Sequence, residues 1–170
     1  MTLRIYHGSI INLNVDVIVN AANTRLQHGA GVAAAIARAA GPGFQRESNA
    51  VTFCPIGEAV ATTGGWLRAK HVVHVPTMDL EPWGRIAGPE DIASGARAAI
   101  RLCLELGGKS IAFPLLGAGI AGGSRKEVAR TLAGVFEEYP DLDILLCAYT
   151  GADREAVAGL GPEMAEAPGT

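Results

Sequence analysis

Residues 18–41 combine side chains suited to holding a ligand that carries both phosphates and hydroxyls. An apolar run ends in Asn20 and Asn23, the turn Gly29-Ala30-Gly31 follows, and an Ala-rich segment with helical composition occupies 32–40. Glycines let the backbone turn sharply and let a phosphate approach without a Cβ in the way. The free N–H groups and the dipole of a helix N-terminus favour an anion. Asparagine amides both donate and accept hydrogen bonds, which suits sugar hydroxyls. We therefore predict a phosphate and sugar site here.

A second glycine-rich turn lies at residues 117–122, which read Gly-Ala-Gly-Ile-Ala-Gly. This spacing matches the G-x-G-x-x-G fingerprint of dinucleotide-binding enzymes. Two features oppose that interpretation: the turn lies late in the chain, and no acidic residue ends the next apolar run, which finishes Ala148-Tyr149-Thr150. The turn also lacks the Gly-Lys-Ser/Thr of a P-loop. A dinucleotide-dependent oxidoreductase is therefore only a remote alternative.

Short apolar runs alternate with segments of helical periodicity. Residues 15–19, 110–116 and 142–149 are almost continuously apolar, which is typical of strands buried on both faces. Residues 3–6, 59–62 and 71–75 are further strand candidates. An apolar stripe from Ile92 to Cys103 indicates a helix that ends before Gly107, and Ser124 with Glu127 predicts a capping box for the next helix. The alternation predicts an α/β fold, a three-layer α/β/α sandwich.

Length and composition limit the classes of protein that fit. The 170 residues suit one domain over residues 1–160, followed by a frayed tail over 161–170. A net charge of −3 without a basic run disfavours nucleic-acid binding. Three well-separated cysteines suggest buried thiols rather than disulfides or zinc ligands. His71 and His74 point to opposite faces of a strand, so we expect no metal pair. No membrane span is apparent, and we expect a monomer in the cytoplasm.

Several motifs together resemble the macrodomains, a family that binds ADP-ribose and related nucleotides. The resemblance covers roughly residues 3–150 and implies a mixed, mostly six-stranded sheet between helices. Its ligand is ADP-ribose, free or attached to a protein, and no separate cofactor is implied. The matching motifs are Val19-Asn20-Ala21-Ala22-Asn23, Gly29-x-Gly31-Val32 with Ala35-Ile36, Gly8-Ser9-Ile10, Gly57-Glu58-Ala59, Val72-Val73-His74 and Gly117-Ala118-Gly119-Ile120.

The resemblance also implies which residues contact the ligand. Asn23 would bind the distal ribose, the two glycine turns would hold the pyrophosphate, and Tyr149 would stack on the adenine. As alternatives, Asn23 could simply shape a turn, and Tyr149 could be a strand-end residue whose hydroxyl is exposed to solvent. The ligand-binding residues implied are Ser9, Ile10, Ala21, Asn23, Gly29, Gly31, Val32, Gly117, Ala118, Gly119, Ile120, Ala121 and Tyr149.

Three residues depart from the family pattern. Ser9 replaces an Asp that accepts from the adenine amino group, and we consider Asp16 or Asn12 as replacements for that carboxylate. Ala121 stands where relatives often have Tyr or Phe. Ala33 replaces the carboxylate that helps activate water in MacroD-type relatives.

The resemblance leaves two functions open. The first is slow hydrolysis of ADP-ribosyl esters, either mono-ADP-ribosylated acidic residues or O-acetyl-ADP-ribose. The substrate phosphate would position the water, with Asn23 orienting the ribose and Gly31 leaving space for the water. The second is a reader module that binds ADP-ribose without turnover.

Overall fold

The computed structural model describes residues 3–118 and 124–165. Its strands are β1 (Leu3–His7), β2 (Val17–Asn23), β3 (Val60–Thr63), β4 (His71–Met78), β5 (Ser110–Phe113), β6 (Asp143–Ala148) and β7 (Glu163–Ala165). Its α-helices are α1 (Gly31–Ala40), α2 (Pro42–Val51), α3 (Pro89–Glu105), α4 (Arg125–Phe136) and α5 (Gly151–Val157), and a 3-10 turn, η1, spans Ile10–Asn12.

The strands form one mixed sheet in the order β3-β4-β2-β5-β6-β1-β7. All neighbouring pairs are parallel except β3 with β4. The sheet therefore has seven strands where the sequence implied mostly six. The additional strand, β7, lies in the segment expected to be frayed, and it pairs with β1. Pairing along a strand edge uses backbone groups, so it needs no side-chain periodicity that a sequence would reveal.

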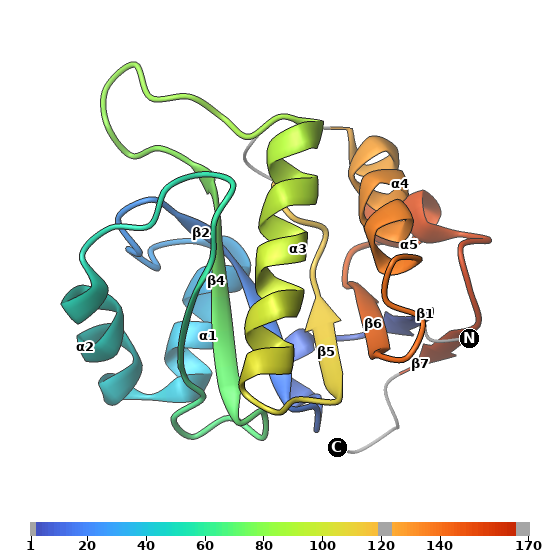
Figure 1. Ribbon diagram of the computed structural model, residues 1–170, viewed down its shortest axis with the longest axis horizontal. Coiled ribbons are helices and arrows are strands. Elements are labelled where there is room, and N and C mark those ends of the chain that lie inside the picture. The colour runs from blue at the N-terminus through green and yellow to red at the C-terminus, as the bar shows by residue number, and fades with distance from the viewer. Residues whose placement is uncertain (1–2, 119–123, 166–170) are drawn as a thin grey trace.

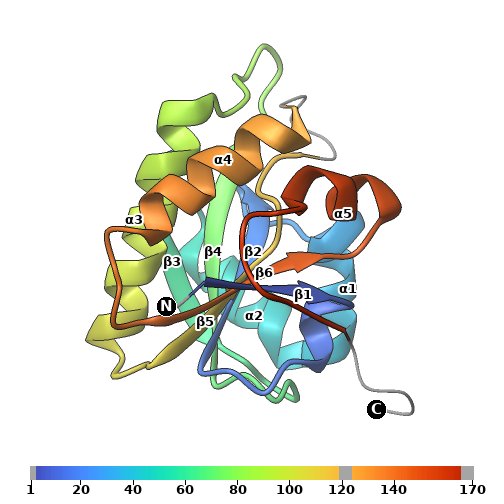
Figure 2. The same ribbon diagram turned by 90° about the vertical axis from the view of Figure 1, so that its right-hand side faces the viewer.

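Helices cover both faces of the sheet, which confirms the α/β/α sandwich (Figures 1 and 2). On one face, α3, α4 and α5 contribute Ile100, Leu132 and Val157 to a core that includes alternate residues of the central strands. On the other face, Ile36 of α1 and Phe44 of α2 pack on the opposite side of the same strands. Burial on both faces explains why the central strands are almost wholly apolar.

Two local predictions need correction. Ser124 occupies the N-cap of α4, but its side chain makes no capping hydrogen bond, so the predicted capping box is wrong. A capping box does occur in α5, where Thr150 Oγ1 accepts from Asp153 N and the Asp153 carboxylate accepts from Thr150 N. Helix α2 was not predicted, because its polar sequence Gln-Arg-Glu-Ser-Asn lacks a broad apolar stripe.

The carboxyl ends of β1, β2, β4, β5 and β6 lie at one edge of the sheet, because these strands are parallel. Strands β2 and β5 pair only at Val17–Ile111 and Ile18–Ala112. Beyond that point β5 ends at Phe113, whereas β2 continues beside β4 to Asn23. The loops after β2 and β5 therefore start from neighbouring strands at the edge where ligands of open α/β sheets bind.

Candidate functional site

The turn between β2 and α1 presents backbone to solvent. Gly29, Ala30 and Gly31 are exposed, and Gly31 has φ +61°, a conformation that favours glycine. Helix α1 begins at Gly31, one residue before the predicted start, with Ala30 at its N-cap. Ala30 offers no side-chain oxygen, so the first N–H groups of α1 receive no side-chain cap. The turn can thus donate to an anion.

Asn23 ends β2 and organises the loop that follows. Its Oδ1 accepts from the backbone N–H groups of Arg25 and Gln27, both at 3.1 Å, and its Nδ2 donates to Gln27 O at 2.6 Å. These bonds show that Asn23 shapes the turn, which was the alternative to ribose binding that the sequence left open. The second hydrogen on Nδ2 has no acceptor within residues 3–118 and 124–165, so the turn role does not preclude contact with a ribose.

Asn20 does not face the site, and its predicted contribution to sugar binding is wrong. Its side chain is fully buried, with Nδ2 lying 3.3 Å from His28 Nδ1 and 3.1 Å from His74 Nδ1. The chain of contacts continues from His28 Nε2 to Ser48 Oγ at 2.9 Å and from His74 Nε2 to Thr62 Oγ1 at 3.0 Å. Asn20 therefore joins β2, β3, β4 and α2, and through His28 the network reaches the residue that precedes the β2–α1 turn. We call these five residues the buried polar network.

Hydrogen-bond directions in the network follow from Ser48. Its hydroxyl donates to Phe44 O at 3.0 Å, so it accepts from His28 Nε2–H and leaves His28 Nδ1 as an acceptor for Asn20. Burial lowers the pKa of His28, and burial together with His28 lowers the pKa of His74 to about 3. Both rings are therefore neutral near pH 7. With Phe44 they form a packed group, the two imidazole centroids being 5.2 Å apart.

The turn after β5 forms the second part of the site. Gly117 has φ +74°, and Ala118 is buried. Gly119, Ile120 and Ala121 lie outside the described residues. Because β5 is the sheet neighbour of β2, this turn starts beside the β2–α1 turn, as the interpretation of two phosphate loops requires.

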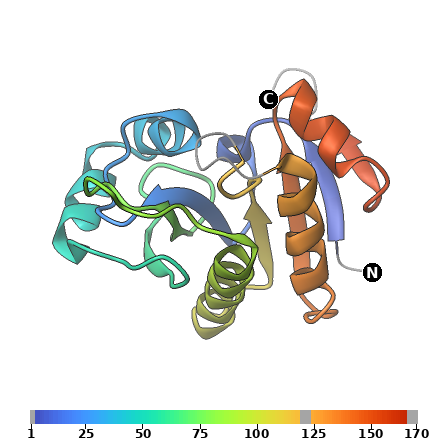
Figure 3. The same ribbon diagram turned by 90° about the horizontal axis from the view of Figure 1, so that it is seen from above.

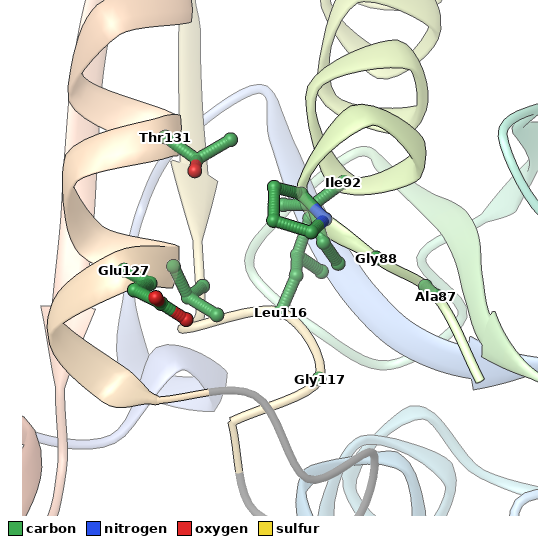
Figure 4. Close-up of a pocket in the computed structure, with 9 residues that line it drawn as sticks. Ala87, Gly88, Ile92, Leu116, Gly117, Glu127 and Thr131 are labelled. Carbon is green, nitrogen blue, oxygen red and sulfur yellow. The ribbon is translucent and has the colours of Figure 1, made fainter.

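The β5 turn also borders a hollow between α3 and α4 (Figure 4). The space between its walls, open solvent included, is about 340 Å³, and Glu127 is the charged side chain among its described lining residues. The hollow lies on the α3–α4 face, whereas the β2–α1 turn leads to the opposite face. Its lining residues are Ala87, Gly88, Pro89, Ile92, Leu116, Gly117, Glu127, Val128 and Thr131.

The residues implied for adenine binding follow two neighbouring strands. Strand β1 pairs with β6 at His7–Ala148, so Ser9 and Tyr149 leave the same edge of the sheet. Tyr149 is 70% exposed and thus accessible to a stacking partner. The Ile10 side chain is buried in the core, so a ligand at Ile10 can reach only its backbone. Ala21 and Val32, on β2 and α1, are half-buried.

Asp16 cannot replace the carboxylate missing at Ser9. It precedes β2 and therefore lies at the opposite edge of the sheet. There its Oδ2 accepts from Lys109 N at 2.8 Å and Ser110 N at 3.2 Å, and its Oδ1 lies 3.0 Å from Lys70 Nζ. The backbone bond from Lys109, followed by the bond from Lys70, lowers the pKa of Asp16 to about 2. Asp16 joins loops and strands and has no part in the ligand site.

The remaining candidate groups are structural. Cys54, Cys103 and Cys147 are all buried free thiols with pKa values raised by burial, as expected for core cysteines. Ala33 is also buried, in the first turn of α1. Within residues 3–118 and 124–165, no cluster of three His, Cys, Asp or Glu side chains could hold a metal ion. In the same ranges, no helix is long and apolar enough to cross a membrane.

Comparisons with known proteins agree on one family. A family model described as Macro domain matches residues 19–132. An uncharacterized protein of Mycobacterium tuberculosis is 41% identical over 137 residues, which cover 81% of this chain and 37% of that protein. A Macro domain-containing protein of Methanosarcina mazei is 35% identical over 151 residues, covering 85% of this chain and 80% of its own length. The chain thus spans little more than a third of its mycobacterial relative.

Solved structures give the same result. A Trypanosoma brucei macrodomain in complex with ADP-ribose superposes with a TM-score of 0.79 at 31% identity, covering 91% of this chain and 67% of that one. The Oceanobacillus iheyensis macrodomain with ADP superposes with a TM-score of 0.79 at 26% identity, covering 89% and 85%.

Proposed function

The chain belongs to the macrodomain family, and on that premise we propose that it binds ADP-ribose and slowly hydrolyses ADP-ribosyl esters. The observation that carries the binding proposal is the pair of glycine turns after the neighbouring strands β2 and β5. The β2–α1 turn offers the uncapped N–H groups of α1, and the β5 turn begins beside it at the same edge of the sheet, so a pyrophosphate held there would lie against both turns. The ADP-ribose and ADP bound to the trypanosomal and Oceanobacillus macrodomains support this ligand.

The two ends of the ligand would lie over different strands. Tyr149, exposed after β6, would stack on the adenine, a contact worth about 1–3 kcal/mol for a base on an aromatic ring. Asn23, at the end of β2, would contact the distal ribose through the Nδ2 hydrogen that has no acceptor among the described residues. Ser9 lies beside the adenine end but offers only a neutral hydroxyl, so we expect weaker selection for adenine than a carboxylate would give.

Hydrolysis in this site would depend on the substrate rather than on a protein base. Ala33 carries only a methyl group, and both ring nitrogens of His28 are engaged by Asn20 and Ser48. We propose that a phosphate of the bound substrate positions water at the anomeric carbon, while Asn23 orients the ribose. Positioning alone can contribute several kcal/mol to lowering a barrier. The expected substrates are esters of ADP-ribose, either mono-ADP-ribosylated acidic side chains or O-acetyl-ADP-ribose.

Calorimetry with free ADP-ribose tests the binding proposal. Gly29→Glu places a carboxylate in the β2–α1 turn, where a Cβ meets nothing within 4 Å, so the fold should tolerate it. Gly134→Glu is the control: Gly134 is an exposed residue of α4, away from the site, and a Cβ there also meets nothing within 4 Å. We expect Gly29→Glu to abolish binding and Gly134→Glu to preserve it. Equal affinity for the two variants would show that the turn is not the phosphate site.

Turnover assays distinguish a hydrolase from a reader. Wild type, Asn23→Ala and the exposed-residue control Asn14→Ala are incubated with a Glu-linked ADP-ribosylated protein and with O-acetyl-ADP-ribose. Hydrolysis predicts product release that Asn23→Ala abolishes and Asn14→Ala retains. Binding without release would instead support the reader, an alternative favoured by the engagement of Asn23 with its own loop.

The oxidoreductase alternative receives no support. The strand order β3-β4-β2-β5-β6-β1-β7 differs from the doubly wound order 3-2-1-4-5-6 of dinucleotide-binding folds.

A further inference from the structure

Residues 79–88 form a hairpin between β4 and α3 that several hydrogen bonds hold in shape. Met78 pairs with Ile86 across it, and Asp79 N donates to Arg85 O at 3.0 Å. Gly84 N closes the tip by donating to Glu81 O at 2.9 Å. At its base, Arg85 donates to both carboxylate oxygens of Asp91, at 2.6 and 3.1 Å. These bonds fix the shape of the hairpin, so it presents its side chains in a defined arrangement.

The hairpin exposes three large apolar side chains, Leu80, Trp83 and Ile86, which we call the apolar tip. Trp83 is fully exposed, and Leu80 and Ile86 are each nearly half exposed. Trp83 also has φ +66°, which is rare and costly for a bulky residue. A strained, fully exposed tryptophan adds nothing to the core. Grouped apolar side chains on a surface, tryptophan above all, are typical of interaction sites.

The apolar tip stands beside the proposed ribose end of the ligand site. Thr24 N donates to Met78 O at 3.0 Å, where the hairpin leaves β4, and Arg25 Nε donates to Glu81 Oε1 at 2.7 Å. The hairpin is therefore bonded to the loop that begins at Asn23. Seen from above, it reaches across the sheet edge toward the segment that leads into α1 (Figure 3).

We propose that the apolar tip docks the polypeptide that carries the ADP-ribosyl group. The inference rests on the proposed function, because the distal ribose is the point at which ADP-ribose is joined to a protein. Charge favours a polypeptide over a nucleic acid: Arg25 is neutralised by Glu81 and Arg85 by Asp91, so neither is available to a phosphate backbone. Leu80, Trp83 and Ile86 would instead pack against apolar side chains of the polypeptide near the modified residue.

The first test compares two ligands: free ADP-ribose and a short peptide carrying one ADP-ribosyl group through a hydrolysis-resistant linkage. We expect Trp83→Ala to weaken peptide binding about tenfold and to leave free ADP-ribose binding unchanged. The matched control is Trp66→Ala. Trp66 is 77% exposed in the β3–β4 turn, at the opposite edge of the sheet, and its replacement should change neither affinity.

The second test uses fluorescence. The chain contains two tryptophans, so Trp66→Phe leaves Trp83 as the single indole. Binding of the modified peptide should shift the emission of Trp83 and protect it from acrylamide, whereas free ADP-ribose and the unmodified peptide at the same concentration should not. A change with free ADP-ribose equal to that with the modified peptide would place Trp83 against the nucleotide and overturn the proposal.

Failure of this inference can be separated from failure of the proposed function. If wild type binds neither free ADP-ribose nor the modified peptide, the ligand assignment itself is wrong. If it binds both and Trp83→Ala leaves their affinity ratio unchanged, only the docking surface is refuted. Sedimentation of wild type and Trp83→Ala addresses a second copy as occupant: a dimer that Trp83→Ala dissociates would overturn docking of a modified polypeptide.

Discussion

Replacing Asn20 by Ala should destabilise the protein more than an exposed Asn→Ala substitution does. The change removes the two Nδ2 contacts to His28 and His74, each worth about 1 kcal/mol net. It also leaves His74 Nδ1 buried without a donor, at a cost of about 1–3 kcal/mol. Asn20 Oδ1 itself lacks a hydrogen-bond partner among the described residues, and removing it offsets about 1–2 kcal/mol of the loss. These contributions combine to an expected net cost of about 1–4 kcal/mol.

Urea unfolding at pH 7.5 measures this cost, with Asn14→Ala as the exposed control. A double-mutant cycle with His74→Ala isolates the Asn20–His74 bond, whose coupling we expect near 1 kcal/mol. The network also holds His28, which lies in the loop between Asn23 and the β2–α1 turn. Asn20→Ala should loosen that loop and so weaken the proposed binding of ADP-ribose as well. A cost no larger than that of Asn14→Ala, with zero coupling, would refute the assignment of the network.

Three further predictions concern stability. The pKa of His74 is about 3 when folded and near 6.5 when unfolded. Between those pH values the unfolded chain binds the extra proton, so stability should fall on acidification by up to about 1.4 kcal/mol per pH unit. Unfolding measured against pH should show a smaller fall for His74→Gln. Gly41→Ala should cost at least about 1–3 kcal/mol in thermal unfolding, because φ is +87° and the new Cβ would lie 2.7 Å from the Trp66 ring. Gly29→Ala, with open space, is its control. Asp16→Asn should cost about 1–3 kcal/mol at pH 7, and the difference from wild type should vanish as pH falls from about 4 to 2, where the wild-type carboxylate protonates.

The layered fold was predictable because its signals are local. Apolar runs buried on both faces identified the regions of β2, β5 and β6, and glycine turns marked the ends of β2 and β5. The ends of elements depend on partners elsewhere. Strand β2 continues past Val19 through the polar Asn20, because Asn20 lies opposite His74 in the register of β4 and finds its hydrogen bond there. No pattern within residues 15–23 contains that partner.

The wrong assignment of Asp16 has the same cause, because its partners are also distant in the sequence. The sequence offers Asp16, with Asn12, as a replacement for the carboxylate missing at Ser9. Its actual partners, Lys70, Lys109 and Ser110, come from loops and strands far along the chain and lie at the other edge of the sheet. Which edge a residue occupies depends on strand direction, and the sequence implied parallel strands without fixing the position of Asp16 among them.

The two asparagines of β2 differ in their surroundings. Asn20, opposite His74 in β4, is fully buried, whereas Asn23 follows a shift in the β2–β4 register and is partly exposed. Alternation along the strand does not separate them, because both faces of this central strand are covered and the register shifts before Asn23. The division has a functional consequence. Asn20 uses both amide hydrogens to hold two neutral imidazoles, so of these two asparagines only Asn23 keeps an amide hydrogen for the proposed ribose contact. Because His28 and His74 are occupied in this way, neither can serve as an imidazole base in the hydrolysis proposed above, which relies on positioning of the substrate.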